Sequence, residues 1–313
     1  MSTVTVIIPT GCEARRAALL HRALDSVMGQ EGVDVHPVVV VNGARVDEAL
    51  CASIVARPGV TVLRRDEGNV SAARRAGMRL VDGAYFAFLD DDDEFLPGAL
   101  RTRAEHLDRD GAVDIVFTNG MVRTTDGDEP MFPPGQALDI KPVETFLESN
   151  WFASCGCLFR AARVDASHFE TRHVYFEWSD LFFRLVAANR RFAYVDAITF
   201  RKYEDHPVSM SRSDTSRLAY PALLAELVER PLPHALRATL QQRFHRALNN
   251  ASLLCLTRGK LRRAIGYHAW CLMNGGWRYA PYTRKIVAAA WRRLVAGQPA
   301  VSMVGRTVGG RPD

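Results

Sequence analysis

AYFAFLDDDD, residues 84–93, joins a hydrophobic run directly to four consecutive aspartates. Like charges at adjacent positions repel, so such a block is either a solvated surface run or a site whose repulsion is cancelled by a bound cation. Mg²⁺ and Mn²⁺ prefer oxygen ligands and are typically held by one or two carboxylates plus substrate phosphates. The alternative is an acidic helix N-terminus, but four aspartates exceed what capping needs. We therefore interpret the run as a candidate metal site.

Strands and helices alternate on the N-terminal side of this run. The hydrophobic pattern predicts strands at residues 3–10, 35–43, 60–65 and 84–89, separated by helices at residues 13–30, 46–56 and 70–81. Continuous apolar strands in this order are typical of a parallel α/β sheet, in which ligands bind outside the carboxyl ends of the strands. Pro9-Thr10, Asn42-Gly43 and the Asp run each end a predicted strand, so we expect all three to converge on one crevice.

The pattern changes after residue 105. Strands are predicted at 114–122 and 155–161, a helix at 177–189, two short strands within 192–203, and an acidic Gly- and Pro-rich loop, a candidate lid, at 124–136. Residues 215–296 are predicted to form helices. The expected organisation is an enzyme-like domain at 1–213, a basic helical region at 214–296 and a disordered tail at 297–313.

Bulk composition is that of a globular protein. The chain has 313 residues, of which 48% are hydrophobic and 24% charged. The N-terminus lacks the basic region and apolar length of a signal peptide, and no run of about 18 apolar residues occurs, which predicts a cytoplasmic protein without membrane spans. The six scattered cysteines are then expected to be free thiols.

Charge is distributed unevenly along the chain. Residues 1–213 hold 24 Lys and Arg against 31 Asp and Glu, whereas residues 214–313 hold 16 against 4. Within the tail, residues 282–296 place apolar side chains and Trp291 on one side with basic residues at the flanks. Such a helix can lie on an anionic membrane surface; packing on the catalytic domain or on a second subunit is an equally good alternative. No nucleic-acid partner is expected.

Several segments together resemble a known family. VTVIIPT at 4–10, ALDSVMGQ at 23–30, the stretch from DEGNVSAARR to the Asp run at 66–93, and FLPGAL at 95–100 follow in the order and spacing of family-2, GT-A-type inverting glycosyltransferases. The resemblance covers about residues 3–212. It implies the GT-A fold, a Rossmann-like, mixed but mainly parallel sheet flanked by helices, here with a C-terminal helical extension.

The resemblance also implies a chemistry. Such enzymes bind a nucleoside-diphosphate sugar, here expected to be a UDP-sugar, through Mn²⁺ or Mg²⁺ and pass the sugar to an acceptor hydroxyl with inversion. By position, Asp92 is the direct metal ligand, and Asp90 shares the metal or, like Asp91, reaches the ribose. Pro9 and Thr10 line the nucleoside pocket, and Arg74 lies near the diphosphate. The cation neutralises the leaving group as its charge develops.

The chain departs from the family pattern at two places in the pocket. Val41-Asn42-Gly43 ends the second predicted strand where family members usually carry Asp. Asn42 can still hydrogen-bond the base or ribose, but more weakly than a carboxylate. Gly11-Cys12 stands where an aromatic residue followed by Asn is common.

Inversion requires a general base that takes the acceptor proton. The family supplies it from an E-D-x-D-like motif, and this chain has Glu177-Trp178-Ser179-Asp180. We predict Glu177 as the base and Asp180 as the second candidate; the alternative is that both cap a helix. The resemblance implies that His206 completes the metal shell or touches the diphosphate, although a lone His is more often structural.

Rival interpretations are weaker. Cys155, Cys157, His168 and His173 imitate a zinc set only loosely, and no Gly-rich phosphate loop occurs. The processive family members' Q-x-x-R-W motif is absent, which favours addition of a single sugar to a saccharide or lipid-linked acceptor, as in synthesis of a bacterial surface polysaccharide or glycolipid. A nucleotidyltransferase, or a degenerate protein that binds nucleotide sugar without turnover, are the alternatives.

Overall fold

The computed structural model describes residues 1–204, 213–230, 232 and 234–296. The chain divides into two compact units, Met1–Ser209 and Met210–Asp313. The first contains the β-sheet and the second is helical. His206 and the tail from residue 297 lie outside the described residues.

Four parallel strands form the N-terminal half of the sheet. They lie in the order β3-β2-β1-β4, and their bounds are β1 Thr3–Thr10, β2 Asp34–Asn42, β3 Thr61–Arg65 and β4 Tyr85–Phe88. The helices between them are α1 Ala17–Met28, α2 Glu48–Val55 and α3 Val70–Met78. Because the four strands are parallel, their carboxyl ends meet at one edge, as the alternating pattern predicted.

The rest of the sheet is mixed. β8 (Cys157–Arg160) runs antiparallel to β4 and β6 (Ile115–Thr124), whereas β9 (Phe192–Tyr203) runs parallel to β6. The short β5 (Glu94–Phe95) closes the edge beside β9, and β7 (Gly127–Pro130) pairs with β6. The Asp run therefore lies between β4 and β5.

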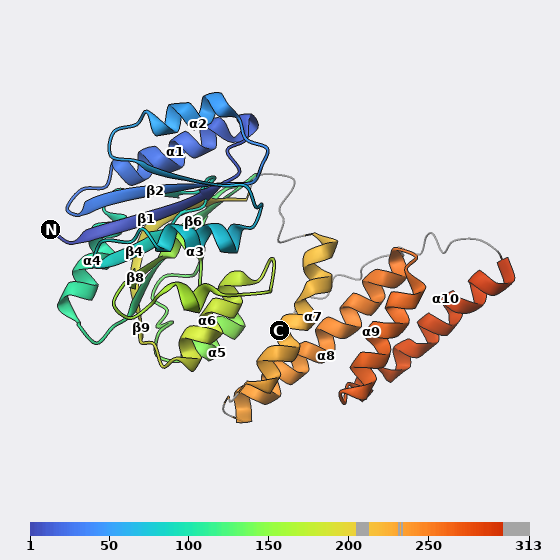
Figure 1. Ribbon diagram of the computed structural model, residues 1–313. Helices are drawn as coiled ribbons and strands as arrows, with labels where there is room; N and C mark the ends of the chain where they lie inside the picture. The colour runs from blue at the N-terminus through green and yellow to red at the C-terminus, as the bar shows by residue number, and fades with distance from the viewer. Residues whose placement is uncertain (205–212, 231, 233, 297–313) are drawn as a thin grey trace. The chain divides into compact units, whose positions relative to one another are not determined.

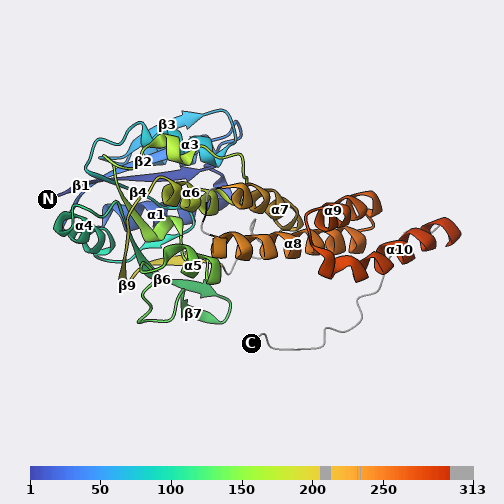
Figure 2. The ribbon, with the colours of Figure 1, turned by 90° about the horizontal axis from the view of Figure 1, so that it is seen from below.

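Helices cover both faces of the sheet (Figures 1 and 2). Side chains of α1, α2 and α4 (Ala99–Arg109) pack on one face, where Val4, Val6 and Ile8 are fully buried. α3 packs on the other face so closely that Gly77 has no room for a side chain beside Ile7. α5 (Pro142–Glu148) and α6 (Glu177–Ala187) add an aromatic cluster, in which the Phe146 and Phe182 rings stack with centroids 4.1 Å apart.

Two predicted elements were wrong. The segment 192–203 is one strand rather than two, because irregular pairing with β6 near Thr118 and Asn119 accommodates the polar Asp196 without ending the strand. The first half of the predicted loop 124–136 is a β-hairpin formed by β6 and β7. Its turn contains Asp126-Gly127, with a positive φ of 131° at the glycine, and Asp-Gly is a strong hairpin signal.

The second unit consists of packed helices. They are α7 Asp214–Glu229, α8 His234–Thr257, α9 Leu261–Met273, the 3-10 helix η5 Trp277–Tyr282 and α10 Thr283–Ala296. Among the helices of the described ranges, none combines the length and the apolar content needed to cross a bilayer.

Candidate active site

The four aspartates form a tight turn after β4. The Asp93 amide donates to the Asp90 carbonyl oxygen at 3.1 Å, which folds the run back on itself. Asp91 and Asp93 are consequently buried, whereas the side chains of Asp90 and Asp92 are 33% and 39% exposed. The turn thus separates two inward carboxylates from two that solvent can reach.

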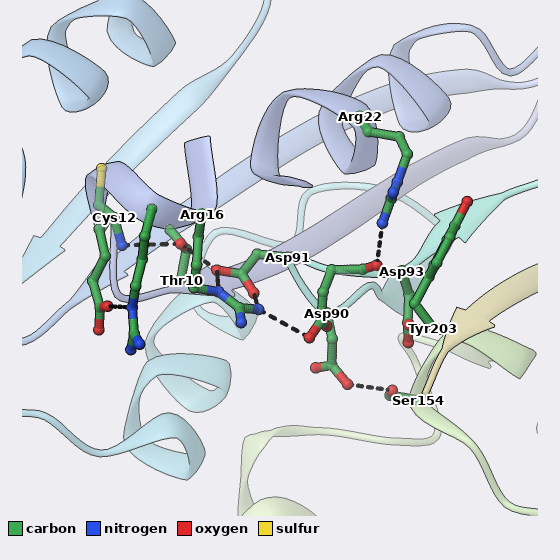
Figure 3. Close-up of polar contacts among 12 residues, drawn as sticks. Thr10, Cys12, Arg16, Arg22, Asp90, Asp91, Asp93, Ser154 and Tyr203 are labelled. Atoms are coloured by element: carbon green, nitrogen blue, oxygen red, sulfur yellow. Dashed lines mark hydrogen bonds and ion pairs between the residues drawn. The ribbon is translucent and has the colours of Figure 1, made fainter. Parts of the chain in front are cut away.

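Asp91 ties the end of β4 to the end of β1. The Thr10 hydroxyl donates to Asp91 Oδ2 at 2.6 Å, and the Arg16 guanidinium forms an ion pair with the same carboxylate. Thr10 Oγ1 also accepts the Cys12 amide at 3.0 Å. These contacts hold the loop after β1 against the Asp run, so Asp91 is engaged within the protein (Figure 3).

Asp93 faces the opposite side of the turn. Its Oδ1 accepts the Tyr203 amide at 3.1 Å, which joins the run to the end of β9. Burial, together with the neighbouring charges of Asp90 and Asp92, raises the pKa of Asp93 well above its usual value. A carboxyl that is buried and already bonded to backbone has a structural role.

Asp90 binds Arg74 and Ser154. The Arg74 guanidinium donates to Asp90 Oδ1 at 3.0 Å, and the Ser154 hydroxyl donates to Oδ2 at 2.9 Å. Burial alone would raise the pKa of Asp90, but the Arg74 charge and these two hydrogen bonds hold it below its usual value. Asp90 is therefore an ionised carboxylate beside an arginine from α3.

Asp92 is the second accessible carboxylate. Its Oδ2 lies 3.0 Å from the Arg16 guanidinium, and its carbonyl oxygen accepts from Arg22 at 2.6 Å. Burial and the charge of Asp90 raise the pKa of Asp92. Two carboxylates that repel each other at the end of a strand are relieved by a cation.

The donor set fits a magnesium-type ion. In the part of the chain that the structure describes, no group of three or more acidic, His or Cys side chains could hold a metal alone. Mg²⁺ in nucleotide sites does not need one, because it is commonly held by one or two carboxylates plus substrate phosphates. Asp90 and Asp92 supply that number.

A pocket of about 600 Å³ opens at the same edge of the sheet. It is lined by the loops that follow β1 and β2, including Gly11, Glu13, Asn42 and Arg45. Asn42 Oδ1 accepts the Asn69 amide at 3.0 Å, which links the wall to the start of α3. Pro9 and Thr10 are buried beneath this wall.

Glu177 and Asp180 have different environments at the start of α6. Glu177 is half-buried and lines a small cavity with Ser71, Arg74 and Trp178. Since Arg74 also binds Asp90, this arginine neighbours both Glu177 and the Asp run. Asp180 is fully buried and forms an ion pair with Arg184 at 2.8 Å. Of the two, Glu177 is the one that solvent reaches.

Trp178 is packed into the aromatic cluster. Its ring lies 5.3 Å from the Arg74 guanidinium carbon and 5.6 Å from the Phe88 ring centroid. Trp178 therefore supports Arg74 through a cation–π contact.

The residues that loosely imitate a zinc set have other surroundings. Cys155 and Cys157 are buried, and His168 lies 3.0 Å from the carboxylate of Asp165.

Sequence reasoning missed the residues that compensate the aspartates. Arg16 and Arg22 from the α1 region, and Ser154 before β8, all bond to the Asp run. Arg22 also stacks on the Tyr203 ring, with 3.7 Å from its guanidinium carbon to the ring centroid. Four clustered carboxylates require nearby cations. That requirement is the signal in the sequence that could have identified the arginines soon after the end of β1.

Known proteins show the same family and fold. The sequence model of glycosyl transferase family 2 matches residues 5–166. The succinoglycan biosynthesis protein ExoO of Rhizobium meliloti is 36% identical over 134 residues, which is 41% of this chain and 38% of that protein. An uncharacterised protein of Mycobacterium tuberculosis is 30% identical over 124 residues, which is 39% of this chain and 38% of that protein. The matches thus span little more than a third of these relatives.

Solved structures support the fold over a longer range. The crystal structure of Staphylococcus aureus TarS 1-349 in complex with UDP-GlcNAc superimposes with a TM-score of 0.61 at 14% identity, covering 89% of this chain and 92% of that one. The complex of the same protein with UDP gives a TM-score of 0.56 at 15% identity, and the match covers 95% of this chain and 92% of that chain. The GT-A fold expected from the sequence is confirmed. With the family model matching half of its length, the chain belongs to glycosyl transferase family 2.

Proposed function

We propose that the protein is a metal-dependent, inverting, non-processive glycosyltransferase that uses a nucleoside-diphosphate sugar. The observation that carries this proposal is that the accessible carboxylates Asp90 and Asp92 and a pocket of about 600 Å³ occur at the same carboxyl edge of the parallel strands. Ligands of open α/β sheets bind at that edge. The structurally similar TarS binds UDP-GlcNAc and UDP, which supports a UDP-sugar as the donor here.

Asp90 and Asp92 would hold Mn²⁺ or Mg²⁺, whose charge stabilises the diphosphate leaving group. Arg74 is fixed between Asp90 and the Trp178 ring. It would add a second positive charge next to that leaving group. Asn42 and the loop from Gly11 to Glu13 form the wall that receives the nucleoside. On the basis of the sequence alone, His206 stays a candidate to complete the metal shell or to contact the diphosphate.

Glu177 is our candidate for the general base. The acceptor hydroxyl attacks the anomeric carbon as the bond to the diphosphate breaks, and the carboxylate takes the hydroxyl proton. This role is supported by the partly exposed position of Glu177 beside Arg74. Asp180, by contrast, is buried in an ion pair. The acceptor is proposed to be a saccharide or a lipid-linked glycan, in line with the role of ExoO in succinoglycan biosynthesis.

The C-terminal helix α10 supports a peripheral membrane contact. Val287, Trp291 and Val295 recur at helical spacing and are 59%, 66% and 67% exposed, while Ile286 and Ala289 pack inward. Arg284, Lys285 and Arg292 are also exposed. An apolar stripe with basic flanks suits an anionic bilayer, and such a contact would bring the enzyme to a lipid-linked acceptor.

A donor-hydrolysis assay tests this function. The protein is incubated with UDP-, GDP- and dTDP-sugars and Mn²⁺, and released nucleoside diphosphate, sugar and pyrophosphate are measured. Slow release of one nucleoside diphosphate is expected, and Asp92→Asn should abolish it. In a parallel reaction supplied with a nucleoside triphosphate and a sugar 1-phosphate, release of pyrophosphate would instead indicate a nucleotidyltransferase. The absence of turnover in both reactions would indicate a degenerate binding protein.

The base is tested separately once an acceptor is known. Glu177→Gln is expected to lower kcat by about 10²–10⁴-fold, the usual contribution of a general base, without weakening donor binding. Glu170→Gln is the matched control, because Glu170 is exposed and its carboxylate forms an ion pair with Arg75. Unchanged kcat in Glu177→Gln would place the base elsewhere.

A further inference from the structure

A second pocket lies within the helical unit, outside every residue assigned above. It has a volume of about 510 Å³ and lies between α7 and α8. α7 contributes Arg217 and Tyr220, one turn apart. α8 contributes residues that recur every three or four positions along one face of the helix: Arg243, Arg246, Ala247, Asn250, Ala251, Leu253 and Leu254.

The floor and rim of this pocket differ in chemistry. Ala247 and Ala251, successive turns of α8, are 7% and 1% exposed and form a buried floor without long side chains. Arg217, Arg246 and Asn250 are exposed around it. The small floor residues leave the space that the arginine side chains surround.

Charge in the pocket is of one sign. The lining residues include three arginines and no acidic residue. Within the described part of the chain, no carboxylate forms an ion pair with Arg217 or Arg246, and the nearby Asp214 is bound to Arg258 at 2.6 Å. Residues 214–296 as a whole hold 14 Lys and Arg against 3 Asp and Glu. Arg217 and Arg246 around one cavity repel each other unless an anion joins them.

We propose that this pocket binds a phosphate or diphosphate group. Arginine forks match phosphate oxygens in geometry as well as charge, and the Asn250 amide adds neutral donors. Leu253 and Leu254 line one side, so the pocket also accommodates an apolar substituent on the phosphate. The ligand class is a phosphate ester, either free in solution or at the head of a lipid. This site is separate from the proposed donor site and does not depend on glycosyl transfer.

Calorimetric titration tests the site with two probes, inorganic pyrophosphate and farnesyl diphosphate. EDTA is present throughout, so that metal-dependent binding at the Asp run is suppressed. Both probes should bind, and the double variant Arg217→Gln/Arg246→Gln should weaken them at least about tenfold, since each charge-assisted hydrogen bond contributes about that much. Arg262→Gln/Arg263→Gln is the control, because it removes the same charge from exposed positions of α9 outside the pocket.

Each outcome decides the question. Tighter binding of farnesyl diphosphate than of pyrophosphate identifies a lipid phosphate as the source, and equal binding identifies a free phosphate; both support the site. The proposal is overturned if neither probe binds, if the pocket variant binds as the wild type does, or if the control variant loses as much affinity. Circular dichroism verifies folding of both variants. UDP titration with Mn²⁺, on EDTA-free samples of the same proteins, reports on the donor site independently.

Discussion

At the scale of single residues, two adjacent arginines after β1 should differ sharply in their effect on stability. The Arg16 side chain is 30% exposed and pairs with the buried Asp91, whereas the Arg15 side chain is 79% exposed and pairs with the partly exposed Glu13. Arg16→Gln leaves a buried carboxylate without its cation and should lower the free energy of unfolding by about 2 kcal/mol. Arg15→Gln should change it by less than about 0.5 kcal/mol. Urea denaturation measures both, and equal losses would mean that Asp91 does not depend on Arg16.

The same residues show what could be predicted and what could not. The strand-end position of the Asp run followed from AYFAFL alone, because a buried strand must end where charges begin. Which of the four carboxylates turns inward depends on Thr10, Arg16 and Tyr203, which lie about 75 to 110 positions away in sequence. A single sequence does not contain that pairing, so the division between buried and accessible aspartates needed the structure.

At the scale of elements, two helical glycines predict opposite effects of adding one methyl group. A Cβ at Gly77 in α3 would lie 2.5 Å from Ile7 Cγ2, inside the fully buried contact with β1, whereas a Cβ at Gly266 in α9 meets nothing within 4 Å. Gly77→Ala should destabilise the protein by about 1–2 kcal/mol through overpacking. Gly266→Ala should stabilise it by about 0.5–1 kcal/mol through helix propensity. Thermal or urea unfolding of the two variants compares them, and stabilisation by Gly77→Ala would contradict the close packing of α3 on the sheet.

His268 makes the attachment of α9 to α10 sensitive to pH. It is 5% exposed, it lies 2.7 Å from the Thr283 hydroxyl, and burial lowers its pKa below the usual value. The unfolded chain therefore binds the proton more readily, so this contribution to stability is complete above about pH 6.5, the usual His pKa, and is lost as the pH falls below it. Hydrogen exchange in α9 and α10 should rise between pH 7.5 and 5.5, after correction for intrinsic rates. His268→Gln should remove that extra rise; an identical rise in the variant would assign it to another group.

The parallel half of the sheet was easier to predict than the mixed half for a physical reason. Strands β1, β2 and β4 are buried on both faces and read as unbroken apolar runs. β9 contains Asp196, which bonds the Gly135 amide at 2.7 Å, and irregular pairing with β6 keeps the strand continuous around it. A polar residue inside a strand looks like an end when only the hydrophobic pattern is available, which explains why one strand was predicted as two.

At the scale of the whole molecule, the basic helical unit predicts binding to anionic membranes. The protein should sediment with vesicles that contain phosphatidylglycerol and not with neutral phosphatidylcholine vesicles, and the bound fraction should fall with added salt. Trp291→Ala removes the largest exposed side chain of the α10 stripe and should reduce binding several-fold. Tyr279→Ala, on the neighbouring η5, serves as the control for loss of an aromatic ring. Concentration-dependent dimerisation without vesicle binding would instead assign the stripe to a second copy of the chain.

The central claim concerns the nucleotide and metal site proposed at the end of β4. Calorimetric titration of UDP with Mn²⁺, and again with EDTA, tests it most directly in the wild type and in Asp92→Asn, with GDP and dTDP as competing nucleotides. We expect UDP to bind with Mn²⁺, and the affinity to fall at least about tenfold both in EDTA and in the variant, because the ion joins Asp92 to the diphosphate. UDP binding that is equally tight with and without metal and unaffected by Asp92→Asn would contradict the account.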